Sequence, residues 1–198
     1  FFFKQKTAYE IPKRDWSSDV CSSDLYYRLG DALRFVDENN VNRGFYFDGR
    51  IAEDFKLDTA TWVQVGPLRA AFIDHCAPYV QDVVIAGIDR AYVSALAFPD
   101  VESCRALAGA PNATMADLAA HPRVREEMQK RLASFAKQST GSANCIRRLT
   151  ILTEPPSIDK SEMTDKGSIN QRAVLGNRAA LVASLYDNAP GAHVLTAD

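Results

Sequence analysis

The stretch that decides the fold is VQDVVIAGIDRAYVSALAFP, from Val80 to Pro99, which holds two apolar runs with a short turn between them. The runs Val80–Ala86 and Val93–Phe98 are rich in β-branched and other apolar residues, and Gly87-Ile88-Asp89 separates them. Runs of this length, bounded by turn-forming residues, are typical of strands. The stretch therefore predicts two paired strands.

Helical patterns flank these strands on both sides. Apolar residues recur at intervals of three or four, after Gly66-Pro67 at Leu68, Ala71, Phe72 and Cys76, and after Pro122 at Val124, Met128, Leu132 and Phe135. This spacing places the apolar side chains on one face of a helix, and proline suits a first helical turn.

Three further elements complete the expected domain. A strand is expected over Leu149–Leu152 and a final helix over Ile169–Tyr186, while Thr114 and Asp117 can cap a short helix. The order helix, strand, strand, helix, strand, helix predicts a small α+β domain with helices packed against a short sheet. Upstream, Ala32–Val36 and Phe45–Phe47 flank a turn-rich segment and predict a separate β-hairpin.

Composition excludes several classes of protein. The chain has 198 residues, a formal net charge of -2 and no run of Lys or Arg, so neither nucleic acid nor an anionic membrane surface is expected as a partner. No apolar stretch approaches the roughly 20 residues that a membrane span requires. The four cysteines and three histidines show no metal-ligand or triad spacing, so no metal site is predicted and reduced thiols in the cytoplasm are expected.

The first 25 residues are expected to have little structure. Lys4–Glu10 and Asp15–Leu25 resemble the conceptual translation of a sequencing-library adapter, with a short variable segment between them. Residues of such an origin carry no information about the fold of the natural protein. This resemblance also predicts that the natural protein begins upstream of Tyr26.

Three short motifs occur in a fixed order along the remaining chain. They are Tyr27-Arg28-Leu29-Gly30-Asp31, then GRIAEDFK at Gly49–Lys56, and TDKGSINQR at Thr164–Arg172. Together they resemble the ribose motif Y-R-x-G-D, the hinge motif G-R-x-x-D-x-I-K and the terminal lysine loop T-x-x-G-K of the adenylate-forming superfamily.

Within that superfamily, the sequence is most similar to feruloyl-CoA synthases. The similarity extends from Tyr26 to Tyr186 and is clearest in FDGRIAEDFKL, TWVQVGPLR, APYVQDVVIAG, EPPSID and TDKGSINQRAVL. The resemblance implies a carboxy-terminal piece of an AMP-forming aryl-CoA ligase. Residues 26–51 would form the tail of the large nucleotide-binding domain and residues 52–198 the mobile carboxy-terminal domain.

The resemblance also implies the substrates. These are an aromatic acid such as ferulate, ATP (with AMP as product) and CoA, with Mg²⁺ accompanying the ATP. The family's phosphate loop and most of its acid-binding pocket lie upstream, so this piece alone is expected to be inactive.

Asp31 and Arg50 are the candidate nucleotide-binding residues. An ionised carboxylate can accept two hydrogen bonds from a ribose diol, and a guanidinium offers a rigid set of donors to ribose or phosphate oxygens. The alternatives are a turn aspartate for Asp31 and a surface salt bridge for Arg50.

Lys166 is the candidate catalytic residue. Attack of a carboxylate on the α-phosphate of ATP brings anionic groups together, and a mobile lysine stabilises that transition state. An ungapped match to the family places Ser168 where the lysine usually stands, and Lys166 lies two residues earlier. We assign the role to Lys166, and the alternative is a merely solvated lysine.

The hinge is assigned to Ala52 and Glu53, and Lys56 and Trp62 are expected to face CoA. The family usually has Asp or Lys where this chain has Ala52, but small residues can absorb the rotation of a hinge. Ala60 stands where related sequences tend to have glycine. Trp62 has an alternative role as an ordinary core aromatic.

Two other functions remain open at this level. One is an adenylating ligase for a different carboxylic acid, such as a fatty acid, because the acid pocket lies upstream. The other is a non-catalytic α+β interaction module.

Overall fold

A computed structural model describes residues 30–197 of the chain, which divides between Ala52 and Glu53 into two compact units. The adapter-like leader and the start of the first motif, Tyr27–Leu29, lie outside the described residues. The assignment of residues 1–25, 26–51 and 52–198 to a leader and two domains stays a prediction.

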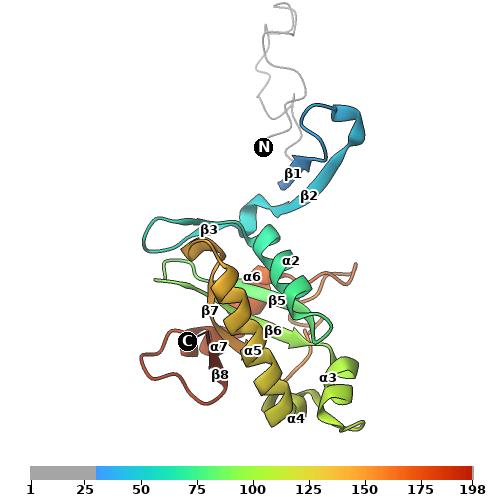
Figure 1. Ribbon diagram of the computed structural model, residues 1–198, viewed down its shortest axis with the longest axis vertical. Coiled ribbons are helices and arrows are strands. Elements are labelled where there is room, and N and C mark those ends of the chain that lie inside the picture. Colours follow the sequence, from blue (N-terminus) through green and yellow to red (C-terminus); the bar gives the residue numbers. More distant parts are fainter. Residues whose placement is uncertain (1–29, 198) are drawn as a thin grey trace, which may run out of the picture. The chain divides into compact units, whose positions relative to one another are not determined.

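The first unit contains a β-hairpin. Strands β1 (Asp31–Phe35) and β2 (Phe45–Arg50) pair antiparallel, and a short 3-10 helix, η3 (Val41–Arg43), lies between them. The rings of Phe35 and Phe45 lie 4.7 Å apart across the strands. The hairpin expected from the alternating sequence is therefore confirmed (Figure 1).

The second unit is built on a four-stranded sheet in the order β5-β6-β7-β8. Its strands are β5 (Val80–Ala86), β6 (Val93–Pro99), β7 (Ile146–Ile151) and β8 (Val194–Thr196). β5 and β6 pair antiparallel, β6 and β7 parallel, and β7 and β8 antiparallel. The predicted strand pair is β5 and β6, and the sheet confirms the α+β class.

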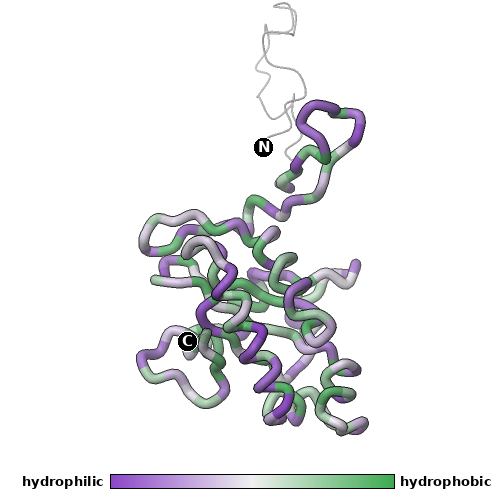
Figure 2. The backbone as a smooth tube through the Cα atoms, viewed as in Figure 1, coloured by the Kyte–Doolittle hydropathy of each residue, from purple (hydrophilic) through white to green (hydrophobic). Residues whose placement is uncertain are grey.

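Both faces of the sheet are buried, because alternate residues of the strands enter two different cores. Val83 and Ile85 of β5 belong to the larger core, whereas Val84 between them belongs to the smaller one. Figure 2 shows hydrophobic residues concentrated along the central strands. Burial on both faces explains why these strands are continuously apolar rather than alternating.

Six helices of the described residues surround this sheet. They are α2 (Val65–Cys76), α3 (Val101–Ala108), α4 (Met115–Ala120), α5 (Pro122–Gln138), α6 (Gln171–Asn177) and α7 (Ala179–Ser184). Helices α2 and α5 lie side by side across one face (Figure 1), and α2 contributes Leu68, Phe72 and Cys76 to the larger core. Val174 of α6 belongs to the smaller core on the other face.

The expected final helix over Ile169–Tyr186 was wrong as a single element. It is two short helices, α6 and α7, which are separated at Arg178, where φ is -107° and ψ is 30°. The Arg178 side chain bonds to a distant carboxylate and to two loop carbonyls, so the backbone leaves helical geometry where the side chain is held.

A second hairpin, β3 (Phe55–Lys56) with β4 (Trp62–Val63), lies against the turn between β5 and β6. The Asp58 N–H donates to the Arg90 carbonyl at 3.1 Å, and the Asp89 N–H donates to the Lys56 carbonyl at 3.1 Å. Gly87 packs directly against the Phe55 ring. The hairpin is thereby fixed to the sheet.

Gly87→Ala is expected to destabilise the protein by about 1–3 kcal/mol, the usual cost of overpacking a filled site. The new Cβ would lie 2.8 Å from Cε2 of the buried Phe55 ring, which is too close. Urea unfolding of the two forms measures the effect. As a matched control, Gly176→Ala in α6 meets no atom within 4 Å and is expected to be neutral or stabilising. Equal stability of Gly87→Ala and the unaltered protein would contradict the packing argument.

Candidate functional site

Asp31 and Arg50 lie opposite each other at the open end of the hairpin. They are direct cross-strand partners in the β1–β2 register. Cross-strand partners lie close together, with Cβ atoms roughly 5 Å apart in a regular ladder, and here a register irregularity lies between Asp31 and Leu33. Arg50 is exposed and Asp31 is partly exposed, so the structure brings an acceptor and a donor together at one accessible place.

The two residues expected to form the hinge lie where the chain divides. The 3-10 helix η4 (Ile51–Glu53) contains both, and the boundary between the compact units falls between Ala52 and Glu53. Rotation about this point stays a prediction.

Lys56 and Trp62 are also cross-strand partners, in the β3–β4 hairpin. The Lys56 Nζ lies 5.7 Å from the centre of the Trp62 ring, and Trp62 is 49% exposed. Their neighbours Phe55 and Val63 are buried instead. Trp62 is therefore not a core aromatic, and it forms a solvent-facing pair with Lys56.

Ala60, at the tip of this hairpin, has a φ of 61°. This left-handed conformation carries a steric penalty for any residue with a Cβ and none for glycine. Glycine would therefore fit this position without the penalty that Ala60 carries.

Lys166 lies at the tip of a tight turn, Thr164–Ser168, which we call the lysine turn. The Thr164 N–H donates to the Ser168 carbonyl at 2.9 Å, and the Gly167 N–H donates to the Thr164 carbonyl at 2.8 Å. Gly167 has a φ of 78°, which glycine adopts without strain. Lys166 and Ser168 are both exposed, and the residues that flank the turn, Met163 and Ile169, form a β-bridge.

Three residues that surround this turn had no role predicted from the sequence. Glu162 is 1% exposed and forms a two-point ion pair with Arg178, with distances of 3.1 Å and 2.8 Å. The hydrogen bond from Arg178 holds the pKa of the Glu162 carboxyl below its ordinary value, although burial acts in the opposite direction. Gln171, 4% exposed, bonds through its side chain to the edge strand β5. Glu162 and Arg178 lie 16 residues apart with no helical or strand spacing, so no sequence pattern connected them.

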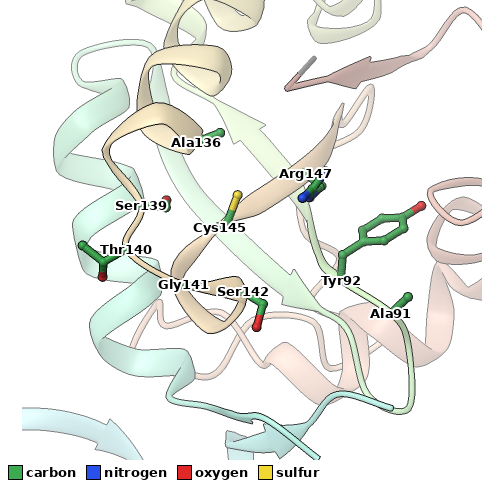
Figure 3. A pocket seen from close by; sticks show the side chains of 9 residues that line it. All are labelled: Ala91, Tyr92, Ala136, Ser139, Thr140, Gly141, Ser142, Cys145 and Arg147. Carbon is green, nitrogen blue, oxygen red and sulfur yellow. The ribbon is translucent and has the colours of Figure 1, made fainter. Parts of the chain in front are cut away.

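A pocket of about 460 Å³ opens near the end of α5 and the start of β7 (Figure 3). Its lining residues are Ala91, Tyr92, Ala136, Ser139, Thr140, Gly141, Ser142, Cys145 and Arg147. None of the candidate site residues lines this pocket. The candidate site residues therefore lie outside this cavity.

Buried thiols are unsuited to nucleophilic chemistry here. Burial raises the pKa of Cys76 to about 12 and that of Cys104 to about 11. Thiolate, the reactive form, is therefore scarce at neutral pH.

Within residues 30–197, no group of three or more His, Cys, Asp or Glu side chains is placed to hold a metal ion. In the same range, every helix is too short or too polar to cross a bilayer.

Comparison with known protein families gives one match over most of the chain. The model of the family described as "AMP-binding enzyme C-terminal domain" matches residues 63–190. No curated protein sequence matches the chain.

Solved structures of adenylation domains share the fold. The adenylation domain of a carboxylate reductase from Mycobacterium chelonae has a TM-score of 0.58 and 20% identity, covering 88% of this chain and 25% of that one. The corresponding domain from Segniliparus rugosus, in complex with AMP and a co-purified carboxylic acid, has a TM-score of 0.54 and 20% identity, covering 80% of this chain and 23% of that one. The chain thus spans about a quarter of these proteins, and at such identities the likeness establishes the fold.

Proposed function

The chain belongs to the family of AMP-binding enzyme C-terminal domains, and we propose that it is the mobile domain of an AMP-forming aryl-CoA ligase of the feruloyl-CoA synthase type. Two half-reactions follow from this assignment. The chain's own residues contribute to both.

In the first half-reaction, an oxygen of the substrate carboxylate attacks the α-phosphate of ATP. A bond forms between this oxygen and phosphorus, the bond to the β-phosphate oxygen breaks, and pyrophosphate leaves. Lys166 supplies a positive charge between the two anionic reactants, where charge builds up in the transition state. The product is an acyl-adenylate, in which the carboxyl carbon has become a reactive electrophile.

In the second half-reaction, the domain rotates about Ala52 and Glu53 and withdraws Lys166. The β3–β4 hairpin, with Lys56 and Trp62 on its exposed face, then approaches the adenylate. The CoA sulfur, having lost its proton, attacks the acyl carbon, and AMP leaves with the electron pair of the broken bond. One small domain thereby serves both steps.

The observation that carries the proposal is the position of Lys166. A lysine that must reach a phosphate in another domain has to stand clear of its own core. Lys166 does so, because it lies exposed at the tip of a hydrogen-bonded turn.

Asp31 and Arg50 fit the nucleotide chemically. The carboxylate of Asp31 can accept hydrogen bonds from both hydroxyls of a ribose, and Arg50, its cross-strand partner, can donate to ribose or phosphate oxygens. The Segniliparus rugosus domain of the same fold was solved with AMP, which supports the same class of ligand. Mg²⁺ would arrive bound to the ATP phosphates, as this ion usually does in enzymes that use ATP.

The choice of an aromatic acid rests on the resemblance to feruloyl-CoA synthases from residue 26 to 186. A ligase for a fatty or other carboxylic acid is the second candidate. We further propose that the protein acts in the cytoplasm and that the present chain, without the upstream acid pocket and phosphate loop, does not turn over substrate by itself.

A substrate panel tests this proposal. A full-length enzyme that carries this carboxy-terminal sequence is incubated with ATP, Mg²⁺, CoA and one acid at a time, and AMP and thioester are measured. Ferulate and related aromatic acids are expected to give both products in equal amounts. Thioester formation only with fatty acids would transfer the assignment to the second candidate, and no AMP with any acid would reject ligase activity.

A further inference from the structure

The lysine turn is the end of a long irregular segment, residues 152–170, which joins β7 to α6. A segment of this length without a helix or a strand ordinarily samples many conformations. A lysine at its tip would then spend little time where the reaction needs it. The structure shows how the segment is held.

The first attachment is the Glu162–Arg178 ion pair. Arg178 donates to both Glu162 oxygens and also to the carbonyls of Glu154 and Pro155, at 3.2 Å and 2.9 Å. One guanidinium thus joins the start of the segment to the residue that precedes the bridge at Met163. The Ser157 N–H adds a hydrogen bond of 2.9 Å to the Glu162 carboxylate.

The pair is shielded from water. The side chains of Arg178 and Glu162 are 11% and 2% exposed, and the guanidinium lies 5.2 Å from the centre of the buried Phe98 ring. Charge-assisted, two-point hydrogen bonds in such surroundings fix geometry closely.

The second attachment follows the turn. The Gln171 side-chain oxygen accepts from the Ile85 N–H, and its amide nitrogen donates to the Val83 carbonyl, both at 2.9 Å. Gln171 therefore pairs with the edge of β5 as a neighbouring strand would. Between the two attachments, the Asn170 N–H donates to the Glu162 carbonyl at 2.9 Å and closes the base of the turn.

We propose that Glu162, Arg178 and Gln171 are positioning residues for the adenylation half-reaction, which hold the lysine turn in place on both of its sides. This inference rests on the proposed function of Lys166. Positioning is required only while Lys166 serves the first half-reaction. The thioester step, in which Lys166 is withdrawn, does not depend on it.

The test uses Arg178→Met and Gln171→Met, with Arg131→Met as the matched control. Arg131 resembles Arg178 closely: it pairs with Glu127, donates to the carbonyls of His75 and Ala77, and lies 5.1 Å from the Tyr79 ring centre. It belongs to α5 and has no contact with the segment in any of these bonds. Gln171→Met changes no charge, so it remains informative should Arg178→Met fail to fold.

Two measurements are made. Hydrogen exchange of this chain is expected to become about 10-fold faster or more at the Thr164 and Asn170 amides in both variants, with β6 amides unchanged. In the full-length enzyme, acid-dependent ATP–pyrophosphate exchange is expected to fall about 10- to 100-fold, since small misplacements of a catalytic group have effects of this size. Thioester formation from added acyl-adenylate is expected to stay constant.

The outcomes separate this inference from the proposed function. Equal loss of both half-reactions, or equal effects of Arg131→Met, would show that the three residues only support the fold. Unchanged pyrophosphate exchange in both variants, in an enzyme where Lys166→Ala abolishes it, would also overturn the positioning role. Unchanged exchange in Lys166→Ala would instead reject the lysine assignment, and with it any positioning role that depends on it.

Discussion

Lys166→Ala in a full-length enzyme carrying this sequence is expected to reduce acid-dependent ATP–pyrophosphate exchange by about 100- to 1,000-fold, the usual effect of removing one group that stabilises transition-state charge. Alanine leaves the turn intact, because the hydrogen bonds of the turn involve Thr164, Gly167 and Ser168. Thioester formation from chemically prepared acyl-adenylate and CoA is expected to be unaffected. The two rates are followed separately, with labelled pyrophosphate and with a thiol assay.

Lys160→Ala is the control for this prediction. Lys160 is also an exposed lysine of the same segment, but it lies outside the lysine turn. Its removal is expected to change neither rate. If Lys166→Ala lost only thioester formation, the catalytic assignment would be refuted, and a comparable loss in Lys160→Ala would point to a general effect of charge.

Asp31→Ala is expected to weaken ATP binding by about 100-fold or more, because two hydrogen bonds to a charged acceptor are lost and each contributes about 1.5–3 kcal/mol. The effect should appear in the KM for ATP and in the Kd of AMP, measured by calorimetry. The KM for the acid and that for CoA should change little, because neither is predicted to contact the hairpin end.

Asp48→Ala serves as the comparison for Asp31→Ala. Asp48 belongs to the same hairpin, in β2, and has no assigned role in nucleotide binding. It is expected to retain nearly the full affinity for ATP. An equal loss of ATP affinity in the two variants would indicate that either substitution disrupts the hairpin itself. Normal ATP affinity in Asp31→Ala would remove Asp31 from the proposed nucleotide site.

The fold was predictable where local pattern and burial agreed. The strands β5 and β6 begin at their predicted residues, β6 ends one residue later than predicted, and α5 begins at Pro122 as expected. The cap of α4 forms with both predicted partners, Thr114 and Asp117. The continuous apolar runs of β5 and β6 and the proline in the first turn of α5 are local signals, and the tertiary structure agrees with them.

Elements that depend on distant partners were missed. The two-residue strands β3 and β4 and the three-residue strand β8 are too short for any periodicity. Helix α3 lies between Asp100, which caps it, and Gly109, whose φ of 69° ends it, so its signals were present but overlooked. The break at Arg178 could not be predicted, because it depends on a carboxylate 16 residues away.

The candidate site was predictable only through its motifs. Asp31 and Arg50 were assigned from two separate motifs, and only the register of the hairpin shows that they are neighbours. Glu162 and Arg178 belong to no local pattern, and Gln171 lies within the third motif without an assigned role, so the contacts of all three became visible only through their hydrogen bonds. The motifs assigned residues that stay predictions, and the structure added the hydrogen bonds from which the positioning residues are proposed.

The side chain of Gln171 also has a consequence for solubility. Strand β5 is an outer strand, and unpaired N–H and C=O groups on such strands attract strands of other molecules, which leads to aggregation. The Gln171 amide occupies the groups of Ile85 and Val83 at the middle of β5. At the opposite side of the sheet, β8 has only three residues and offers little length for such recruitment. In the four-stranded sheet, Gln171 and the shortness of β8 thus reduce the length of open strand through which copies could join.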